Sequence, residues 1–276
     1  SISCIPREMI QAYGIEIVAP NIYWNGQVYR DWLDITPGQA YQLLNQDPNG
    51  FSTAAPSPGH FADTYRRLAA GAESILCITL SSKVSTLHNA AVSARELVKD
   101  ELPDTGIEVL DSRICTGAEG FVVMAAARVA AEGRDFAEVL ESAKKVRNSV
   151  DLLFVLDTVR FAYRTGRIPR FASQVGSLLN VKPVLGWKDG GAYFKGMTRS
   201  KDKGVDRIVD LMHNRVGRQR VHVAVHHTDA VDEGEKLRER VRGEFDCAEL
   251  WLTEFSPIMG YSAGRGALGL AFYIDK

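Results

Sequence analysis

The chain has 276 residues, of which 45% are hydrophobic and 24% are charged, the composition of an ordinary soluble globular protein. Its net charge of −1 gives no reason to expect nucleic acid or an anionic membrane surface as a partner. No apolar run reaches the roughly eighteen residues of a membrane span, and we expect no signal peptide. The four cysteines are far apart and form no C-x-x-C motif, so we expect free thiols and a cytoplasmic protein.

The first sixty residues predict short helices and strands. Pro6 suits the first turn of a helix, and residues 15–19 alternate as a short strand. Asn25-Gly26 between apolar residues predicts a hairpin. Thr36 followed by Pro37 predicts the start of a helix, and Ser57-Pro58 repeats that pattern before a second one.

A buried strand followed by a hydroxyl-rich turn stands out in the next part of the chain. Residues 74–80 form a continuous apolar run, typical of a strand in a parallel sheet. The turn Ser81-Ser-Lys-Val-Ser-Thr86 comes next, and then a predicted helix over 88–102. A helix that begins after such a turn can bind an anion through its free N–H groups. On capping preferences alone, Ser85 or Thr86 is more often only the cap of its own helix.

The rest of the chain alternates strands and helices, which predicts an α/β fold with largely parallel sheets. A break near Ser149-Val150 predicts two α/β domains, residues 1–149 and 150–276, with a ligand site between them. A hairpin is expected around Asp189-Gly190. The expected strands cover residues 107–111, 152–157, 181–185, 221–226, 250–255 and 267–274. The expected helices cover residues 117–131, 135–148, 158–164, 171–180, 205–216 and 233–242.

A glycine-rich segment near the end fits two motifs. Gly260-Tyr-Ser262-Ala-Gly264 matches the G-x-S-x-G of serine hydrolases, but the acid and histidine of that fold follow the serine, whereas the last histidine here is His227. Residues 264–269 match G-x-G-x-x-G, but only seven residues remain after Gly269, too few for a dinucleotide-binding unit. A hydrolase or acyltransferase that uses Ser262 is the alternative left open.

The sequence contains no other complete catalytic or metal-binding motif. It has no H-E-x-x-H and no Walker loop, and adjacent strand residues such as His226 and His227 face opposite ways. We therefore expect no metal. Hydroxyl groups remain at three turns, on Thr53, Ser85 and Ser262. Ligands of open α/β sheets collect beyond the carboxyl ends of strands, so these hydroxyls suit gripping an anionic head group better than breaking bonds.

The order of these segments resembles the DegV family, the bacterial fatty-acid-binding proteins that serve as lipid-presenting subunits of fatty acid kinase. No single segment decides the resemblance, which covers essentially the whole chain. The segments that carry it are residues 13–20, 29–36, 53–59, 81–85, 111–112, 166–168, 178–183, 199–203 and 260–269.

The resemblance implies a two-domain protein that holds one long-chain fatty acid, such as palmitate, stearate or oleate, in an apolar tunnel. It also implies a partner kinase that phosphorylates the carboxylate to an acyl phosphate, a role in phospholipid metabolism, no cofactor and no catalysis by this chain itself. The implied head-group residues are Thr53, Ser85, Thr86, Ser262 and Arg265. Arg167 and Arg199 match basic positions that suit a phosphate or an acidic partner surface.

The departures from the family pattern all fall at the head group. The usual T-S-x-P is here Thr53-Ala54-Ala55-Pro56, and the usual S-G-T is Ser85-Thr86-Leu87. The usual G-x-H-x-G-P-G loses its histidine to Ser262 and its proline to Arg265. These changes leave a different amphiphile open as the ligand.

Two further expectations concern the ends of the chain. We expect Arg265 to replace the charge of the missing histidine, at the carboxylate or facing the kinase, unless it is simply a solvated turn residue. Family members begin with an apolar strand that ends in an Asp-Ser turn. This chain starts at about that serine, so a strand preceding Ser1 is expected.

Overall fold

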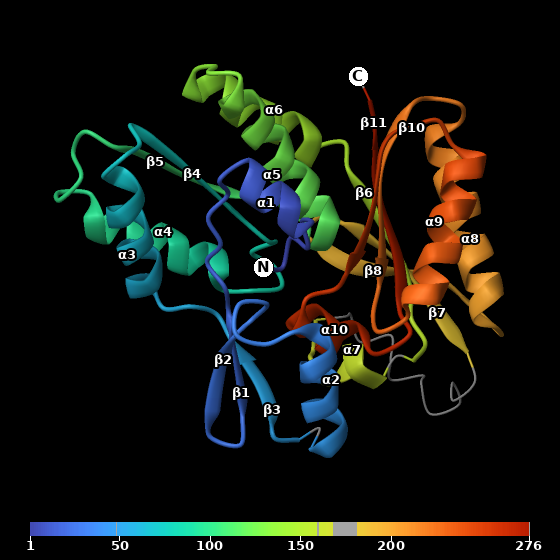
Figure 1. Ribbon diagram of the computed structural model, residues 1–276. Coiled ribbons are helices and arrows are strands. Elements are labelled where there is room, and N and C mark those ends of the chain that lie inside the picture. Colours follow the sequence, from blue (N-terminus) through green and yellow to red (C-terminus); the bar gives the residue numbers. More distant parts are fainter. Residues whose placement is uncertain (48, 159, 168–180, 276) are drawn as a thin grey trace.

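The computed structural model describes residues 1–47, 49–158, 160–167 and 181–275 (Figure 1). The expected helix over 171–180 lies outside these residues. The helices are α1 (Arg7–Ala12), α2 (Pro37–Gln46), α3 (Pro58–Ala69), α4 (Leu87–Val98), α5 (Thr116–Ala131), α6 (Phe136–Arg147), α7 (Arg160–Arg164), α8 (Lys201–Val216), α9 (Val231–Glu244) and α10 (Pro257–Ala263). The strands are β1 (Asn21–Trp24), β2 (Gln27–Arg30), β3 (Phe51–Ala54), β4 (Ser74–Thr79), β5 (Gly106–Asp111), β6 (Asp151–Val155), β7 (Lys182–Lys188), β8 (Gly191–Thr198), β9 (Val221–His227), β10 (Cys247–Glu254) and β11 (Leu268–Ile274).

The largest sheet has six strands in the order β10-β9-β11-β6-β7-β8. The α/β class is confirmed, but the prediction of largely parallel sheets is wrong for this one. Only β9 and β10 pair in parallel; β11 is antiparallel to both β9 and β6, and β6-β7 and β7-β8 are antiparallel. The reason is that alternation along the chain does not set strand direction. The Asp189-Gly190 turn reverses the chain at once, so β8 runs antiparallel to β7. The short helix α10 connects the end of β10 to the start of β11, and β11 therefore runs back through the sheet, antiparallel to β9.

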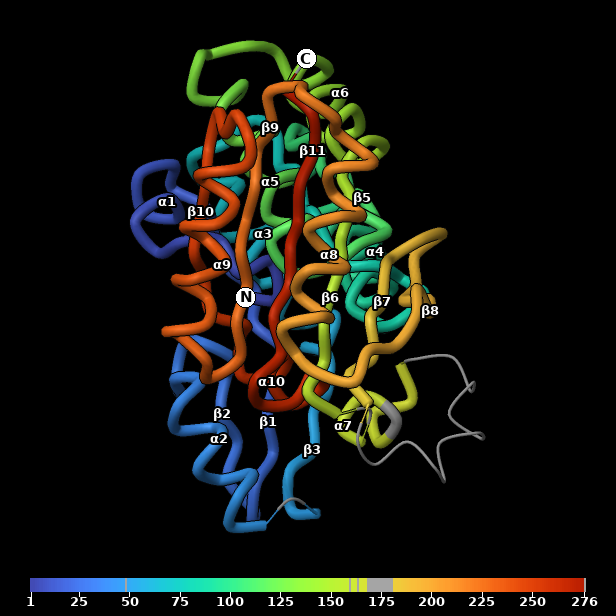
Figure 2. The backbone as a smooth tube through the Cα atoms, turned by 90° about the vertical axis from the view of Figure 1, so that its right-hand side faces the viewer, coloured from blue at the N-terminus to red at the C-terminus, as the bar shows by residue number. Residues whose placement is uncertain are grey.

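Helices cover both faces of this sheet (Figures 1 and 2). On one face, α8 and α9 bury residues such as Met212 and Leu237 against Val223 and Leu270 of the strands. On the other, α5 packs against β9 and β11, and it also contacts β4 of the parallel pair β4-β5. The small residues of α5 allow this close approach, since a side chain at Gly117 would meet the His226 ring within 2.5 Å.

One apolar core therefore extends across the expected domain boundary at residues 149/150. It joins Phe121 and Val122 of α5 to Leu152 and Phe154 of β6 and to Ala224 of β9. The division into domains 1–149 and 150–276 stays a prediction. Helix α5 packs against strands from both sides of this boundary and so joins the two parts.

A small lobe of β1, β2, β3 and α2 lies apart from these layers, at the bottom of Figure 1. Its three-stranded antiparallel sheet has the order β2-β1-β3, with the expected hairpin at Asn25-Gly26. Thr36 caps α2, as predicted from Thr36-Pro37, and it also forms a capping box with Gln39. The small core of the lobe includes Tyr261 of α10, so a C-terminal helix that the sequence did not predict anchors it.

One further prediction is wrong. Residues 15–19 form no strand, although their apolar and polar residues alternate. The segment has no strand partner within the described part of the chain, and a strand needs one to satisfy its backbone groups.

Candidate functional site

A cavity of about 860 Å³ lies where the small lobe, the β4–α4 turn, α10 and the six-stranded sheet meet. It opens beyond the carboxyl end of β4, the place expected for a ligand of an α/β protein. Residues from both sides of the expected 149/150 boundary line it. Its volume falls within the roughly 300–1,000 Å³ typical of small-molecule sites.

Most of the cavity wall is apolar. The sheet contributes Phe154, Leu185 and Trp187, while Met259 comes from α10 and Leu87 from α4. Cys115 also lines it, and burial raises the pKa of its thiol well above the usual range, so this group is neutral at physiological pH. Such a wall favours a hydrocarbon chain over a polar ligand.

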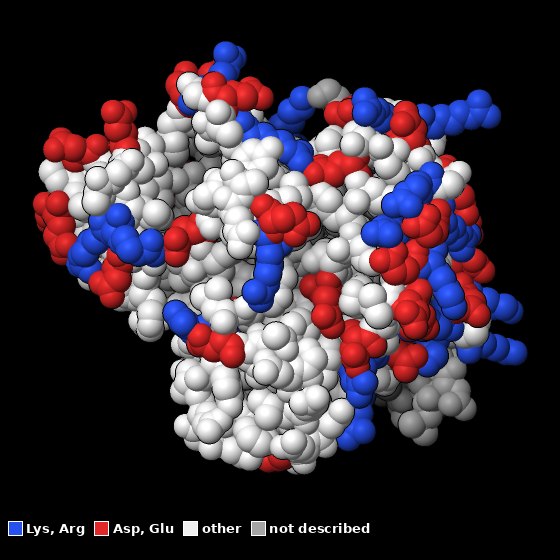
Figure 3. Space-filling model, in the orientation of Figure 1, with Lys and Arg blue, Asp and Glu red and all other residues white. Residues whose placement is uncertain are grey.

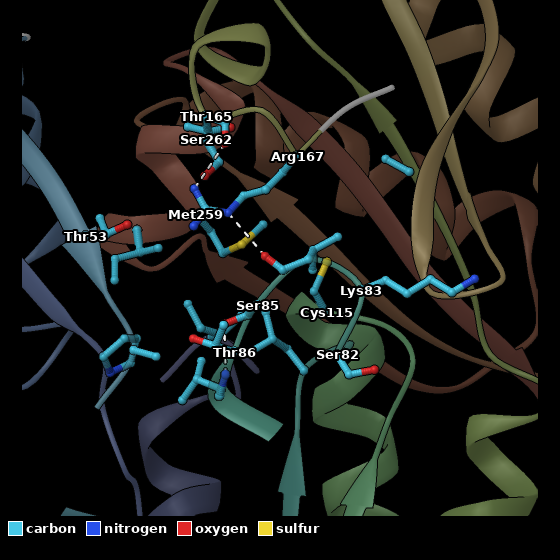
Figure 4. A pocket seen from close by; sticks show the side chains of 18 of the residues that line it. Thr53, Ser82, Lys83, Ser85, Thr86, Cys115, Thr165, Arg167, Met259 and Ser262 are labelled. Atoms are coloured by element: carbon cyan, nitrogen blue, oxygen red, sulfur yellow. Dashed lines mark hydrogen bonds between the residues drawn. The ribbon is translucent and has the colours of Figure 1, made fainter. Parts of the chain in front are cut away.

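The four hydroxyl residues predicted for the head group, Thr53, Ser85, Thr86 and Ser262, all line this cavity (Figure 4). Ser82, Ser93 and Thr165 also line it. Thr53 lies near the end of β3, Ser85 and Thr86 precede α4, and Ser262 lies on the last turn of α10. The tertiary structure thus brings together groups separated by up to about two hundred residues of sequence. Neutral hydroxyls at the edge of an apolar cavity can donate hydrogen bonds to an anionic head group.

The turn before α4 shows which of Ser85 and Thr86 caps its own helix and which lines the cavity without a capping role. Ser85 Oγ accepts a hydrogen bond from the Leu87 N–H at 3.3 Å, so this hydroxyl does support its own turn. Thr86 is the N-cap residue, but its side chain makes no capping hydrogen bond. Both residues line the cavity as well, so the local role of Ser85 leaves its own hydrogen for a ligand.

Two cations also line the cavity, Lys83 and Arg167. Arg167 Nε donates to the Val84 carbonyl at 3.3 Å, and Nη1 donates to the Thr165 carbonyl at 3.4 Å, as the dashed lines of Figure 4 show. These bonds hold the guanidinium beside the hydroxyl groups. The sequence reading did not single out Lys83 or Thr165 as site residues, although Lys83 lies within the hydroxyl-rich turn that it did single out.

Two other predicted site residues lie elsewhere. Arg265 does not line the cavity; it is exposed, and its guanidinium pairs with the carboxylate of Asp229. Arg199 is also exposed and outside the cavity lining. The structure therefore brings Arg167 to the hydroxyl groups and leaves Arg199 and Arg265 on the outer surface.

The surroundings of Ser262 bear on the hydrolase alternative. Among the described residues that line the cavity there is no histidine, aspartate or glutamate. These are the side chains that activate a serine in hydrolase triads. Ser262 also lies near the end of a short helix rather than on a sharp turn between a strand and a helix.

His226 belongs to the core. Its Nε2 accepts the Gly117 N–H at 3.2 Å, its ring stacks on Phe255, and burial lowers its pKa to about 3, so the imidazole is neutral. Within the part of the chain that the structure describes, no three His, Cys, Asp or Glu side chains are grouped as metal ligands. None of the helices in these same residues has both the length and the apolar composition needed to cross a membrane.

Comparisons with known proteins agree with the predicted resemblance. The profile of the family described as "Uncharacterised protein, DegV family" matches residues 1–275. A DegV domain-containing protein of Caldanaerobacter subterraneus subsp. tengcongensis is 31% identical over 273 residues, covering 99% of this chain and 96% of that protein. A DegV domain-containing protein of Clostridium perfringens is 29% identical over 276 residues, covering 99% and 96%.

Solved structures show the same fold. A DegV family protein from Thermus thermophilus, described by its fatty acid binding, superposes with a TM-score of 0.91 at 27% identity, covering 100% of this chain and 97% of that one. A stearic-acid-binding protein from Eubacterium ventriosum has a TM-score of 0.91 at 23% identity, covering 99% and 96%, a likeness that concerns the fold alone. On the family profile, the conserved length and the shared fold, the chain belongs to the DegV family.

Proposed function

We propose that this protein binds one long-chain fatty acid and presents its carboxylate to a partner kinase. The observation that carries the proposal is the cavity, with its apolar wall, the hydroxyl groups of Thr53, Ser85, Thr86 and Ser262 among those that line it, and its Lys83 and Arg167 side chains. Its relative from Thermus thermophilus, described as binding fatty acid, supports the same ligand class.

In this proposal the acyl chain supplies most of the affinity. Burial of each CH₂ contributes about 0.8 kcal/mol, so a chain of palmitate length supplies roughly 10 kcal/mol before the costs of binding. Single hydrogen bonds at the head group are worth about 1.5–3 kcal/mol when one partner is charged. The hydroxyl groups therefore fix the position of the carboxylate, while the apolar wall holds the lipid.

The carboxylate lies, in this proposal, among Thr53, Ser85, Thr86 and Ser262, with Arg167 beside it. A partner kinase would transfer a phosphoryl group from a nucleoside triphosphate to a carboxylate oxygen and so form an acyl phosphate. Arg167 offers charge to the added phosphate. The exposed Arg199 and Arg265 suit the contact with the partner rather than with the lipid. The four cysteines are unpaired, which suits a reducing cytoplasm.

Extraction of the purified protein with organic solvent, followed by mass spectrometry, tests the ligand. We expect about one acyl chain per protein, and uptake of added palmitate or oleate by lipid-free protein. A stoichiometric amphiphile of another class would replace the fatty acid in the proposal. The absence of any lipid, together with no uptake of palmitate or oleate, would contradict it.

A separate experiment addresses catalysis. A fluorophosphonate probe labels an activated serine, and we expect no labelling at Ser262 because no described cavity residue can serve as the usual base. Labelling of Ser262 with turnover of ester substrates would favour the hydrolase instead.

A further inference from the structure

One carboxylate lies buried in a part of the molecule that has few charges. The small lobe, here residues 20–58, contains four charged residues, Arg30, Asp31, Asp34 and Asp47. Figure 3 shows how few charged side chains reach the surface of the lobe. Asp31 is fully buried, directly after β2. A buried carboxylate is costly unless hydrogen bonds satisfy its oxygens, so its partners indicate its role.

Partners of Asp31 lie at the start of α10, far along the chain. Its Oδ1 accepts the Ile258 N–H at 2.9 Å, and the side chain also accepts a hydrogen bond from the hydroxyl of Ser256, the N-cap residue of α10. Its Oδ2 accepts the Ser1 hydroxyl at 2.6 Å. The N–H of Asp31 itself donates to the Pro20 carbonyl at 2.8 Å. The lobe therefore fixes the carboxylate, and the carboxylate in turn holds the first turn of α10.

Helix α10 lies between the lobe and the cavity. Its Ser262 lines the cavity, whereas Tyr261 packs on Phe51 of the lobe with ring centroids 4.8 Å apart. A Cβ at Gly260 would collide with the ring of Tyr41, so glycine lets the helix approach the lobe this closely. Because neighbouring positions of one short helix move together, the contact of α10 with the lobe sets where the Ser262 hydroxyl lies.

We infer that Asp31 is a positioning residue for the head-group site: by holding the first turn of α10, it places the Ser262 hydroxyl at the carboxylate of the bound fatty acid. This inference rests on the proposed function. Asp31 does not line the cavity, so it acts through α10 rather than on the ligand. Burial raises the pKa of the Asp31 carboxyl, but its oxygen can accept the Ile258 N–H whether the group is charged or neutral. Asparagine, which offers the same oxygen, should therefore serve in its place.

The palmitate affinity of three variants tests this role. Asp31→Ala leaves the Ile258 N–H without its partner, and we expect about tenfold weaker binding. Asp31→Asn is expected to recover most of this loss. The matched control is Asp135→Ala, which removes an aspartate that accepts the Glu138 N–H at the start of α6, also at 2.9 Å and away from the cavity. This control should bind palmitate like the unchanged protein.

A double-mutant cycle separates positioning from general stability. In the Ser262→Ala background, Asp31→Ala is expected to weaken binding by less than about twofold further, because the hydroxyl that it positions is gone. Four results would each overturn the inference: unchanged affinity in Asp31→Ala, no recovery in Asp31→Asn, an equal loss in Asp135→Ala, or an undiminished loss in the Ser262→Ala background.

Gly260→Ala disturbs the same contact of α10 with the lobe without altering Asp31, and it replaces Asp31→Ala should that variant fail to fold. It should weaken palmitate binding about fivefold, since the new methyl group meets the ring of Tyr41. Gly260→Ala/Tyr41→Leu should recover part of the affinity, because leucine removes that ring. Unchanged affinity in Gly260→Ala would overturn the inference.

Hydrogen exchange of the α10 amides needs no lipid and separates this inference from the proposed function. We expect faster exchange at residues 258–263 in Asp31→Ala than in the unchanged protein or in Asp135→Ala. Equal exchange in all three proteins would overturn the inference. Faster exchange in Asp31→Ala, with no uptake of palmitate by the unchanged protein, would contradict the proposed function and support the hold of Asp31 on α10.

Discussion

The hydroxyl groups of the cavity have unequal local roles. Ser85 already accepts a hydrogen bond within its turn, and Thr86 makes no capping bond. Thr53 lies on the inner face of β3 in register with Ile22, so its position is set by strand pairing rather than by a flexible loop. A group held by a sheet needs little ordering when a ligand binds, and it is therefore the most informative one to remove.

Replacing Thr53 by valine keeps the shape of the side chain and removes its hydroxyl. We expect a loss of about 10- to 100-fold in affinity for palmitate, the value of one hydrogen bond to a carboxylate. Titration with a displaceable fluorescent fatty acid measures it. Ser52→Ala is the control, because this neighbour points to the opposite, exposed face and does not line the cavity. Equal affinities of Thr53→Val and the unchanged protein would remove Thr53 from the head-group site.

At the scale of elements, the β7–β8 hairpin closes one side of the cavity. Its two-residue turn, Asp189-Gly190, has positive φ at both positions, as a tight turn of this kind requires. Ser81 Oγ donates to the Gly190 carbonyl at 2.6 Å, and Trp187 Nε1 donates to the Arg113 carbonyl at 2.9 Å. These bonds fasten the hairpin to the loops that follow β4 and β5, so Trp187 forms a fixed part of the wall.

Trp187 should therefore report ligand binding. Of the four tryptophans in the chain, Trp187 lines the cavity and Trp24, Trp32 and Trp251 do not. We expect the intrinsic fluorescence to change when palmitate binds, and the change to disappear in Trp187→Phe. The matching substitution Trp32→Phe should keep the full signal. A response that survives in Trp187→Phe would place the acyl chain away from this hairpin.

At the scale of the whole molecule, the two expected domains are joined through α5 and through the cavity. Phe121 of α5 packs on Trp251 of β10 with ring centroids 4.3 Å apart, while the same helix also contacts β4. A core shared in this way couples the unfolding of the two halves.

We accordingly expect one cooperative unfolding transition on heating, followed by calorimetry, and a higher Tm when palmitate is bound. A ligand that binds only the folded state stabilises it by about 2.7 kcal/mol at a hundred times its Kd. Since residues from both halves line the cavity, the whole transition should shift. Two separate transitions, with only one of them moved by the ligand, would support independent domains at the 149/150 boundary.

The sequence by itself determined the α/β class, both hairpins, the caps of α2 and α3, and which turns carry hydroxyl groups, because these features depend on neighbours within a few residues. It also carried the family resemblance, since the order of short motifs survives at low identity. The hydroxyl residues Thr53, Ser85 and Ser262, which line the cavity and are proposed to bind the head group, could be named for the same reason, as local features of three separate turns.

Only the tertiary structure decided how these pieces meet. Strand direction in the six-stranded sheet depends on long-range pairing, so the mixed sheet and the missing strand at 15–19 could not be read from alternation. The pairing of Arg265 with Asp229 placed that arginine outside the cavity, although its sequence position beside Ser262 favoured the opposite.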